Sequence, residues 1–297
     1  MGTCQSLCWE RDLLNMLDSN FIVRLHRTLK DQQFVYFLLE AALGGDLYGM
    51  FNSHQAFYAG CVIAALEHLH ERKIIYRDLK PENIMLDTRG YGKICDMGLA
   101  RFVVGKTNTQ AGTPDYMAPE MIDPPHYHDN SADWWSLGVL VYEMMCQQLP
   151  FEDDELEDTG ERLLAIRRSQ EMRLDFPATC PAGGRAFIAK LLRKLPHRLG
   201  AQGGAEEVRA HYFWQGFDFG SLHQQAMKSP VERPGHREKD RRKKDEKPTK
   251  KRRGSGWTRE LGDFGEFDKP SKRRVLAPAL TQLVTISSRM ASFGFAI

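Results

Sequence analysis

The stretch Tyr76-Arg77-Asp78-Leu79-Lys80-Pro81-Glu82-Asn83 decides the fold of this chain. It places a carboxylate, an ammonium group and an amide within six residues of one another. Asp96 follows Asp78 by eighteen residues, and Glu120 follows Asp96 by twenty-four, at the end of the segment 112–120. Three ordered polar motifs of this kind rarely coincide by chance, so they are interpreted together.

These motifs resemble those of the AGC group of serine/threonine protein kinases, and most closely those of the cGMP-dependent protein kinases. Further segments that carry the resemblance are 21–25, 43–47, 74–76, 133–138 and 198–200. The likeness runs from about residue 10 to residue 222. It implies an α+β fold of the protein-kinase type, with a truncated small β lobe and a mainly α-helical C-lobe.

The resemblance divides the chain into three parts. Residues 1–42 are expected to be a remnant of the kinase N-lobe, and residues 43–222 the C-lobe. Residues 223–297 carry Lys- and Arg-rich low complexity without hydrophobic periodicity, which predicts a basic, disordered tail.

Hydrophobic periodicity predicts the elements within the two lobes. They are a helix over 10–18, antiparallel strands over 21–27 and 34–39, and helices over 47–53, 56–71, 131–147, 160–168, 184–194 and 205–212. The resemblance implies that the first helix is the regulatory helix and that residues 40–42 are the hinge between the lobes. The helix over 56–71 is apolar around most of its circumference, which indicates a central position in the C-lobe.

The composition is that of an ordinary globular protein, with 297 residues of which 42% are hydrophobic. The net charge of +2 is uneven: segment 236–256 holds an excess of seven basic residues, so the remainder is about five units negative. A negative domain suits basic substrates. The six cysteines show neither disulfide nor metal-ligand spacing, and no apolar run reaches the ~18 residues of a membrane span. A soluble, cytoplasmic protein is expected.

The first six residues also fit the myristoylation pattern at Gly2, with Cys4 and Cys8 as candidates for palmitate. A chance start codon explains the same residues. Membrane association through Gly2 and Cys4 is therefore one of two open interpretations.

The resemblance assigns four residues to the chemistry of phosphoryl transfer, in which a protein mainly aligns the nucleophile and neutralises charge. Asp78 matches the aspartate that accepts or orients the substrate hydroxyl proton, and Lys80 matches the lysine that touches the γ-phosphate. Asn83 and Asp96 supply the hard oxygen ligands that Mg²⁺ prefers. ATP and Mg²⁺ are thus the implied co-substrate and cofactor.

Thr109 matches the activation-loop phosphorylation site of the AGC group, which implies an upstream activating kinase. Arg77, with Arg101 nearby, would pair with the phosphate and order the loop. By the same resemblance, Thr113 would contact Asp78 and Lys80 within the catalytic loop.

Three acidic residues match the carboxylates with which the family holds arginines two and three residues before the phosphoacceptor. They are Asp46, Glu82 and Glu143. All three are acidic here, which predicts serine- or threonine-containing protein substrates with basic residues near the acceptor.

The remaining assignments concern the nucleotide pocket and the scaffold. Glu40 and Ala42 of the hinge, with Asp46 and Met85, match nucleotide-binding positions. Structural roles are implied for Glu10, Glu120, Arg198 and Asp133, with Glu120 and Arg198 as an ion pair. Met97 replaces the usual phenylalanine beside Asp96 and is expected to keep an apolar stack with Tyr76, Leu14 and Leu25.

The Gly-rich phosphate loop and the strand lysine of the family are not found in the sequence. Glu10 is therefore expected to lack its lysine partner, and this polypeptide to bind Mg-ATP poorly. Two explanations stay open: an incomplete form of an active kinase, or a pseudokinase that serves as a noncatalytic docking module.

The basic cluster within 237–253 permits a further, accessory interpretation, which is binding of an anionic membrane or a nucleic acid. The interleaved acidic residues weaken its field, and such runs are usually solvated chain.

Overall fold

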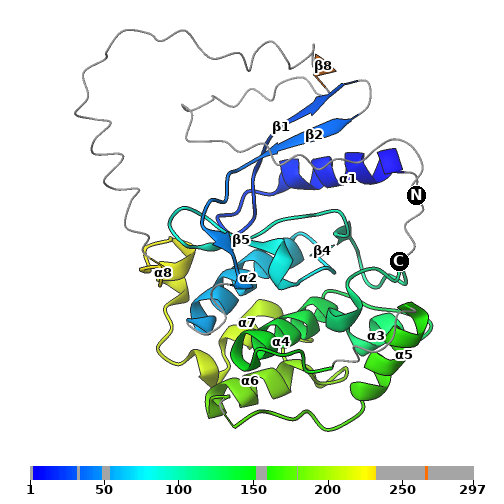
Figure 1. The fold of residues 1–297 in the computed structure, drawn as a ribbon, viewed down its shortest axis with the longest axis vertical. Coiled ribbons are helices and arrows are strands. Elements are labelled where there is room, and N and C mark those ends of the chain that lie inside the picture. Colours follow the sequence, from blue (N-terminus) through cyan, green and yellow to red (C-terminus); the bar gives the residue numbers. More distant parts are fainter. Residues whose placement is uncertain are drawn as a thin grey trace.

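A computed structural model describes residues 3–31, 34–48, 54–151, 159–178, 180–231 and 265–266. One helix and a β-hairpin form a small lobe, which lies over a larger, mainly helical lobe (Figure 1). The predicted α+β fold of the protein-kinase type is thus confirmed. Within the described ranges, no helix combines the length and apolar character needed to cross a bilayer.

The small lobe consists of helix α1 (Thr3–Met16) and the antiparallel strands β1 (Leu25–Lys30) and β2 (Val35–Leu39), with a register shift between Leu25 and Arg27. Helix α1 begins at Thr3, so the prediction that it starts at residue 10 was wrong. The extra turns form because Leu7 and Trp9 pack against the core. They carry no proline or glycine that would stop the helix.

The predicted first strand, 21–27, is also corrected, since β1 begins only at Leu25. The preceding residues turn to the large lobe, where the Val23 amide donates to the Ile94 carbonyl at 2.9 Å. In return, the Ile94 amide donates to the Phe21 carbonyl at 2.8 Å. Phe21 and Val23 are buried, so this segment joins the lobes instead of extending the hairpin.

The large lobe is built around α2 (Gln55–Glu71) and α4 (Ser131–Cys146), whose central residues are buried on all sides. Around them lie α3 (Pro119–Ile122), α5 (Thr159–Ser169), α6 (Ala182–Leu191), α7 (Gly204–Arg209) and α8 (Phe219–His223). The short 3₁₀ helices are η2 (Pro81–Asn83), η3 (Pro114–Tyr116) and η4 (Tyr212–Trp214). The predicted helix over 205–212 ends early, at Arg209, because His211 is extended and turns the chain so that Trp214 enters the core.

Two small sheets carry the site residues. Strands β3 (Gly45–Asp46), β5 (Ile84–Leu86) and β6 (Gly92–Ile94) pair in that order, and β4 (Ile74–Ile75) pairs with β7 (Arg101–Phe102), all antiparallel. The catalytic loop therefore lies between two paired strands, with β4 before it and β5 after it.

Met97 shares one buried core cluster with Tyr76 and Leu14, and Leu25 packs against it. Met97 and Tyr76 are fully buried, and the Tyr76 hydroxyl donates to the Cys95 carbonyl at 2.7 Å. The cluster thus connects α1 of the small lobe to the loops of the large lobe. The flexible Met97 side chain therefore fills this apolar position completely.

The packed chain continues past His223, where the tail was predicted to begin. The Tyr91 hydroxyl donates to the Met227 carbonyl, and Ser229 is buried beside Gly90. Further along, the two-residue strand β8 (Gly265–Glu266) pairs antiparallel with β1.

Several predictions lie outside the described residues. They are most of the helix over 47–53, the lipidation site at Gly2, and residues 232–264 and 267–297 of the tail, which include the basic cluster within 237–253.

Candidate active site

Asp133 holds the backbone at the start of the catalytic loop, residues 76–83. Its carboxylate is fully buried on α4 and accepts hydrogen bonds from the amides of Tyr76, at 2.9 Å, and Arg77, at 2.8 Å. The Nε2 atom of His70 lies 2.7 Å from the same carboxylate. Arg77 is held at a φ of 70°, a conformation that few side chains adopt without such support.

Asp78, Lys80, Asn83 and Thr113 form one hydrogen-bonded cluster. The amide nitrogen of Asn83 donates to the Asp78 carboxylate, and the Thr113 hydroxyl donates to its other oxygen, both at 2.8 Å. The Lys80 ammonium lies 2.9 Å from the Thr113 hydroxyl oxygen and 3.4 Å from the Asp78 carboxylate. The other three residues, which lie within 36 positions of sequence, thus converge on the Asp78 carboxylate.

Asp78 is a buried carboxylate with a donor group on each oxygen. Its side chain is largely buried, at 9% exposure for the residue, yet it is hydrogen-bonded on both oxygens and lies beside an ammonium group. These contacts orient the carboxylate and compensate its burial.

Asp96 is joined to this cluster through the backbone, since the amide of Cys95 donates to the Asn83 carbonyl at 2.9 Å. Asp96 is exposed, has a φ of 55°, and accepts a hydrogen bond from the Gly98 amide at 2.9 Å. The amide nitrogen of Asn83 is turned to Asp78, which directs its oxygen elsewhere. The donor set of one carboxylate and one amide oxygen fits Mg²⁺ that is also ligated by nucleotide phosphates.

Glu10 reaches toward the Asp96 segment from α1. It is 7% exposed, and burial raises the pKa of its carboxyl to about 7, with a further increase from Asp96 and an opposing backbone hydrogen bond at Met97. Among the described residues Glu10 forms no ion pair. The nearly buried Lys93 of β6 pairs with Glu40 instead, at 3.0 Å.

The hinge residues occupy the junction of the two lobes. The Glu40 amide donates to the Arg24 carbonyl at 2.8 Å, which ties the hinge to the start of β1. Ala42 is half-buried, and so is Met85, which lies opposite Asp46 in the β3–β5 pair. The structure therefore brings Asp46 and Met85 together at the backbone level; the Asp46 side chain lies outside the described atoms.

Arg77 connects the catalytic loop to the activation segment. Its guanidinium donates to the Leu99 carbonyl at 2.7 Å and to the Thr109 carbonyl at 3.2 Å, while Thr109 itself is exposed. Burial lowers the pKa of Arg77 to about 10, and the nearby Arg101 contributes to the decrease. A Cβ atom on Gly112, whose φ is 128°, would lie 2.5 Å from the Arg77 carbonyl, so only glycine fits this close approach.

Glu120 and Arg198 form a bidentate ion pair, with nitrogen–oxygen distances of 2.5 and 2.8 Å. Neither residue belongs to the hydrogen-bonded cluster around Asp78. The Arg198 side chain is fully buried, also donates to the Ser131 carbonyl at 3.0 Å, and lies over the Trp135 ring. This pair joins α3 to the chain that follows α6.

Two of the predicted substrate carboxylates are held by tyrosines that sequence reasoning did not assign. The Tyr48 hydroxyl donates to Glu82 at 3.0 Å, and the Tyr116 hydroxyl donates to Glu143 at 2.5 Å. Tyr116 lies within the motif 112–120, one residue from Asp115, which pairs with Arg162 of α5. The position of Tyr116 within this motif could have identified it from the sequence. No sequence motif identifies Tyr48 or Arg162.

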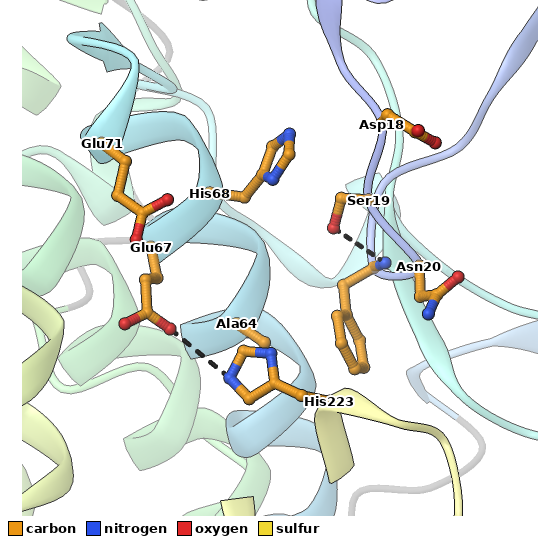
Figure 2. A pocket seen from close by; sticks show the side chains of 9 residues that line it. Asp18, Ser19, Asn20, Ala64, Glu67, His68, Glu71 and His223 are labelled. Atoms are coloured by element: carbon orange, nitrogen blue, oxygen red, sulfur yellow. Dashed lines mark hydrogen bonds and ion pairs between the residues drawn. The ribbon is translucent and has the colours of Figure 1, made fainter. Parts of the chain in front are cut away.

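A pocket of about 300 Å³ lies on another side of the lobe junction, between residues 18–21, α2 and His223 (Figure 2). Glu67, on the α2 side of this pocket, pairs with His223 at 3.4 Å and with Arg209 at 2.5 Å. No residue predicted for catalysis, nucleotide or substrate lines it.

A two-lobed α+β fold with an acid, a lysine, an amide and a second acid near the lobe junction is the arrangement of the protein-kinase class. The chain belongs to the protein kinase family, since the family profile described as "Protein kinase domain" matches residues 2–213. Its relatives place it with the serine/threonine kinases of the AGC type.

Three relatives illustrate this likeness. The chain is 41% identical to cGMP-dependent protein kinase, isozyme 1, of Drosophila melanogaster, over 76% of this chain and 30% of that protein. It is 39% identical to a cGMP-dependent protein kinase of Eimeria tenella, over 75% and 23% of the two chains. It is 37% identical to the cAMP-dependent protein kinase catalytic subunit PRKX of Mus musculus, over 75% and 63%. The chain thus spans less than two thirds of the length of each.

Proposed function

We propose that the protein transfers the γ-phosphate of ATP to serine or threonine hydroxyls in peptides with arginines shortly before the acceptor. The observation that carries this proposal is the convergence of Lys80, Asn83 and Thr113 on the Asp78 carboxylate. A preorganised carboxylate of this kind can take the hydroxyl proton as the oxygen attacks phosphorus.

The roles follow from position. Asp78 orients the hydroxyl and receives its proton, and Lys80 stabilises negative charge on the transferred group. Asn83 and Asp96 hold Mg²⁺, which neutralises the phosphate charge when it is bound. Glu40, Ala42 and Met85 contribute to the nucleotide pocket at the hinge.

Substrate recognition is assigned to the acidic side chains near the lobe junction. Glu82 is exposed and Glu143 nearly buried, and each keeps a tyrosine hydroxyl as a donor. With Asp46 they would pair with arginines of the substrate.

Regulation by phosphorylation at Thr109 is part of the proposal. The Arg77 guanidinium already contacts the Thr109 backbone, and no carboxylate among the described residues forms an ion pair with it. A phosphate there would supply the missing anion. Binding of anionic membrane or nucleic acid by 237–253, a cytoplasmic location and lipidation at Gly2 and Cys4 stay predictions.

A substitution at Asp78 tests the catalytic role. We expect Asp78→Asn to lower transfer of radiolabelled γ-phosphate to an Arg-Arg-Ala-Ser peptide by at least about 10²-fold, because the amide cannot accept the proton. Asp175→Asn, an exposed carboxylate outside the site, is the matched control and should keep full activity. Equal activity of Asp78→Asn and wild type would contradict the assignment.

A second candidate function is a noncatalytic docking module, and the state of Glu10 favours it. A buried carboxyl without an ammonium partner among the described residues is not the arrangement that positions ATP phosphates in active kinases. The two functions separate cleanly: a docking module binds the arginine peptide but neither labels it nor gains thermal stability from Mg-ATP.

A further inference from the structure

Tyr48 and Glu82 form an exposed phenol–carboxylate pair next to the hinge. The Tyr48 hydroxyl donates to one Glu82 oxygen at 3.0 Å, and 45% of Tyr48 is exposed to solvent. Glu82 is exposed as well. The contact joins the start of the C-lobe to η2, across 34 residues of sequence.

A second phenol–carboxylate pair lies close to the first. Tyr116 and Glu143 are 6% and 8% exposed, and their hydrogen bond is 2.5 Å long. Burial raises the pKa of Tyr116 most strongly, followed by the contact with Glu143, and Tyr48 and Glu82 also contribute. The exposed pair, Tyr48 and Glu82, thus lies near enough to the buried pair, Tyr116 and Glu143, to influence it electrostatically.

An exposed aromatic ring beside a carboxylate favours a guanidinium over an ammonium group. A guanidinium is planar and weakly hydrated, so it can lie against the Tyr48 ring while two of its N–H groups point to Glu82. An ammonium group is a compact, strongly hydrated charge that gains less from the ring. The Tyr48 hydroxyl adds orientation, because it fixes the carboxylate beside the ring.

We propose that Tyr48 is a specificity-determining residue that makes this site select arginine over lysine in the basic segment of the peptide. The inference rests on the proposed function, since it concerns the same peptide site. It extends that function, because it assigns the selection of arginine over lysine, which carry the same charge, to the Tyr48 ring.

Peptide binding by the full chain, without ATP, tests this role. Fluorescence anisotropy would give the Kd of labelled Arg-Arg-Ala-Ser and Lys-Lys-Ala-Ser peptides for wild type, Tyr48→Leu, Tyr48→Phe and Tyr212→Leu. Tyr212 is the matched control, because it is 59% exposed and lies on η4, which packs against α6. Circular dichroism would establish that each variant is folded.

We expect the ratio of the lysine to the arginine Kd to fall about fivefold in Tyr48→Leu, which lacks the ring. Tyr48→Phe keeps the ring and should keep the ratio within about twofold, and Tyr212→Leu should not change it. Glu82→Gln provides a second, independent measurement: it should weaken binding of both peptides, and that of the arginine peptide at least as much, since the guanidinium loses a carboxylate that takes two of its N–H groups.

The failures are distinguishable. An unchanged ratio in Tyr48→Leu, with tight binding of the arginine peptide retained, would overturn the role of Tyr48 alone. If wild type bound the arginine peptide no better than an Ala-Ala-Ala-Ser peptide, the proposed basic specificity itself would be overturned, and the role of Tyr48 with it.

Discussion

At the scale of single residues, the site depends on charged groups that are buried in different ways. Asp78 is compensated by an amide, a hydroxyl and an ammonium group, and Asp133 by backbone amides and an imidazole. Glu10 has little compensation, and its pKa is raised to about 7. Burial of a carboxyl thus stabilises or destabilises the fold according to the donors around it.

The raised pKa of Glu10 predicts a pH-dependent stability. In the unfolded chain the Glu10 carboxyl has its ordinary pKa of 4.5. Between pH 4.5 and about 7, Glu10 is therefore more often protonated in the folded protein than in the unfolded chain. The free energy of unfolding therefore decreases as the pH rises through this window, and the cost of charged Glu10 is complete above about pH 7. Glu10→Gln removes the ionisation and should remove this cost.

We expect Glu10→Gln to match wild type near pH 4.5 and to exceed its free energy of unfolding by about 3 kcal/mol at pH 8. Urea unfolding at a series of pH values, without Mg²⁺ or nucleotide, measures the difference. A difference that does not change with pH would show that Glu10 is not buried as the structure has it. Glu71→Gln, an exposed glutamate on α2, is the control.

At the scale of elements, α5 and the residue that follows it, Gln170, make three polar contacts with the segment between the activation loop and α4. Arg162 pairs with Asp115 at 2.9 Å, Arg167 with Asp123 at 2.6 Å, and the Gln170 side chain donates to the Met117 carbonyl at 2.9 Å. Asp115 is next to Tyr116, whose hydroxyl holds Glu143. Helix α5 therefore supports the segment that carries Tyr116, the partner of Glu143.

We expect Arg162→Ala to lower the free energy of unfolding by about 1 kcal/mol, because Arg162 contacts both oxygens of a nearly buried carboxylate while part of its own side chain is solvated. In a double-mutant cycle with Asp115→Asn the coupling energy should account for most of that loss. Arg168→Ala, an exposed arginine of the same helix, should change stability by less than about 0.5 kcal/mol. A coupling energy near zero would contradict the pairing.

At the scale of the whole molecule, the lobes are joined by backbone pairing and by one apolar cluster. The chain at 21–23 pairs with β6, and Leu14 of α1 shares its core with Tyr76 and Met97 of the large lobe. Within the large lobe, the buried Arg198 side chain forms an ion pair with Glu120 and lies over the Trp135 ring. Together these contacts set the position of the catalytic loop relative to both lobes.

Removal of the Arg198 charge should destabilise the whole large lobe. We expect Arg198→Met to cost about 3 to 5 kcal/mol, since Glu120 would be left without its partner and two carbonyls without their donor. Thermal and urea unfolding measure this loss. Lys194→Met breaks an ion pair that is more than half exposed and should cost less than about 1 kcal/mol. Similar losses in the two variants would contradict the burial of Arg198.

The sequence by itself determined the fold class, the family and the helices with strong apolar faces, such as α2 and α4. These follow from local spacing, because motif order and hydrophobic periodicity are properties of neighbouring residues. The candidate residues Asp78, Lys80, Asn83 and Asp96 were assigned through the resemblance of their motifs to those of the family, and their roles stay proposals.

Only the tertiary structure decided the features that depend on residues far apart in the chain. The start of β1 shifted because Phe21 and Val23 pair with a distant strand, and α1 was longer because Trp9 reached the core. The partners of Glu82 and Glu143 could not be predicted for the same reason. A hydrogen bond such as that between Tyr48 and Glu82 is set by packing across 34 residues, and periodicity within one segment contains no information about it.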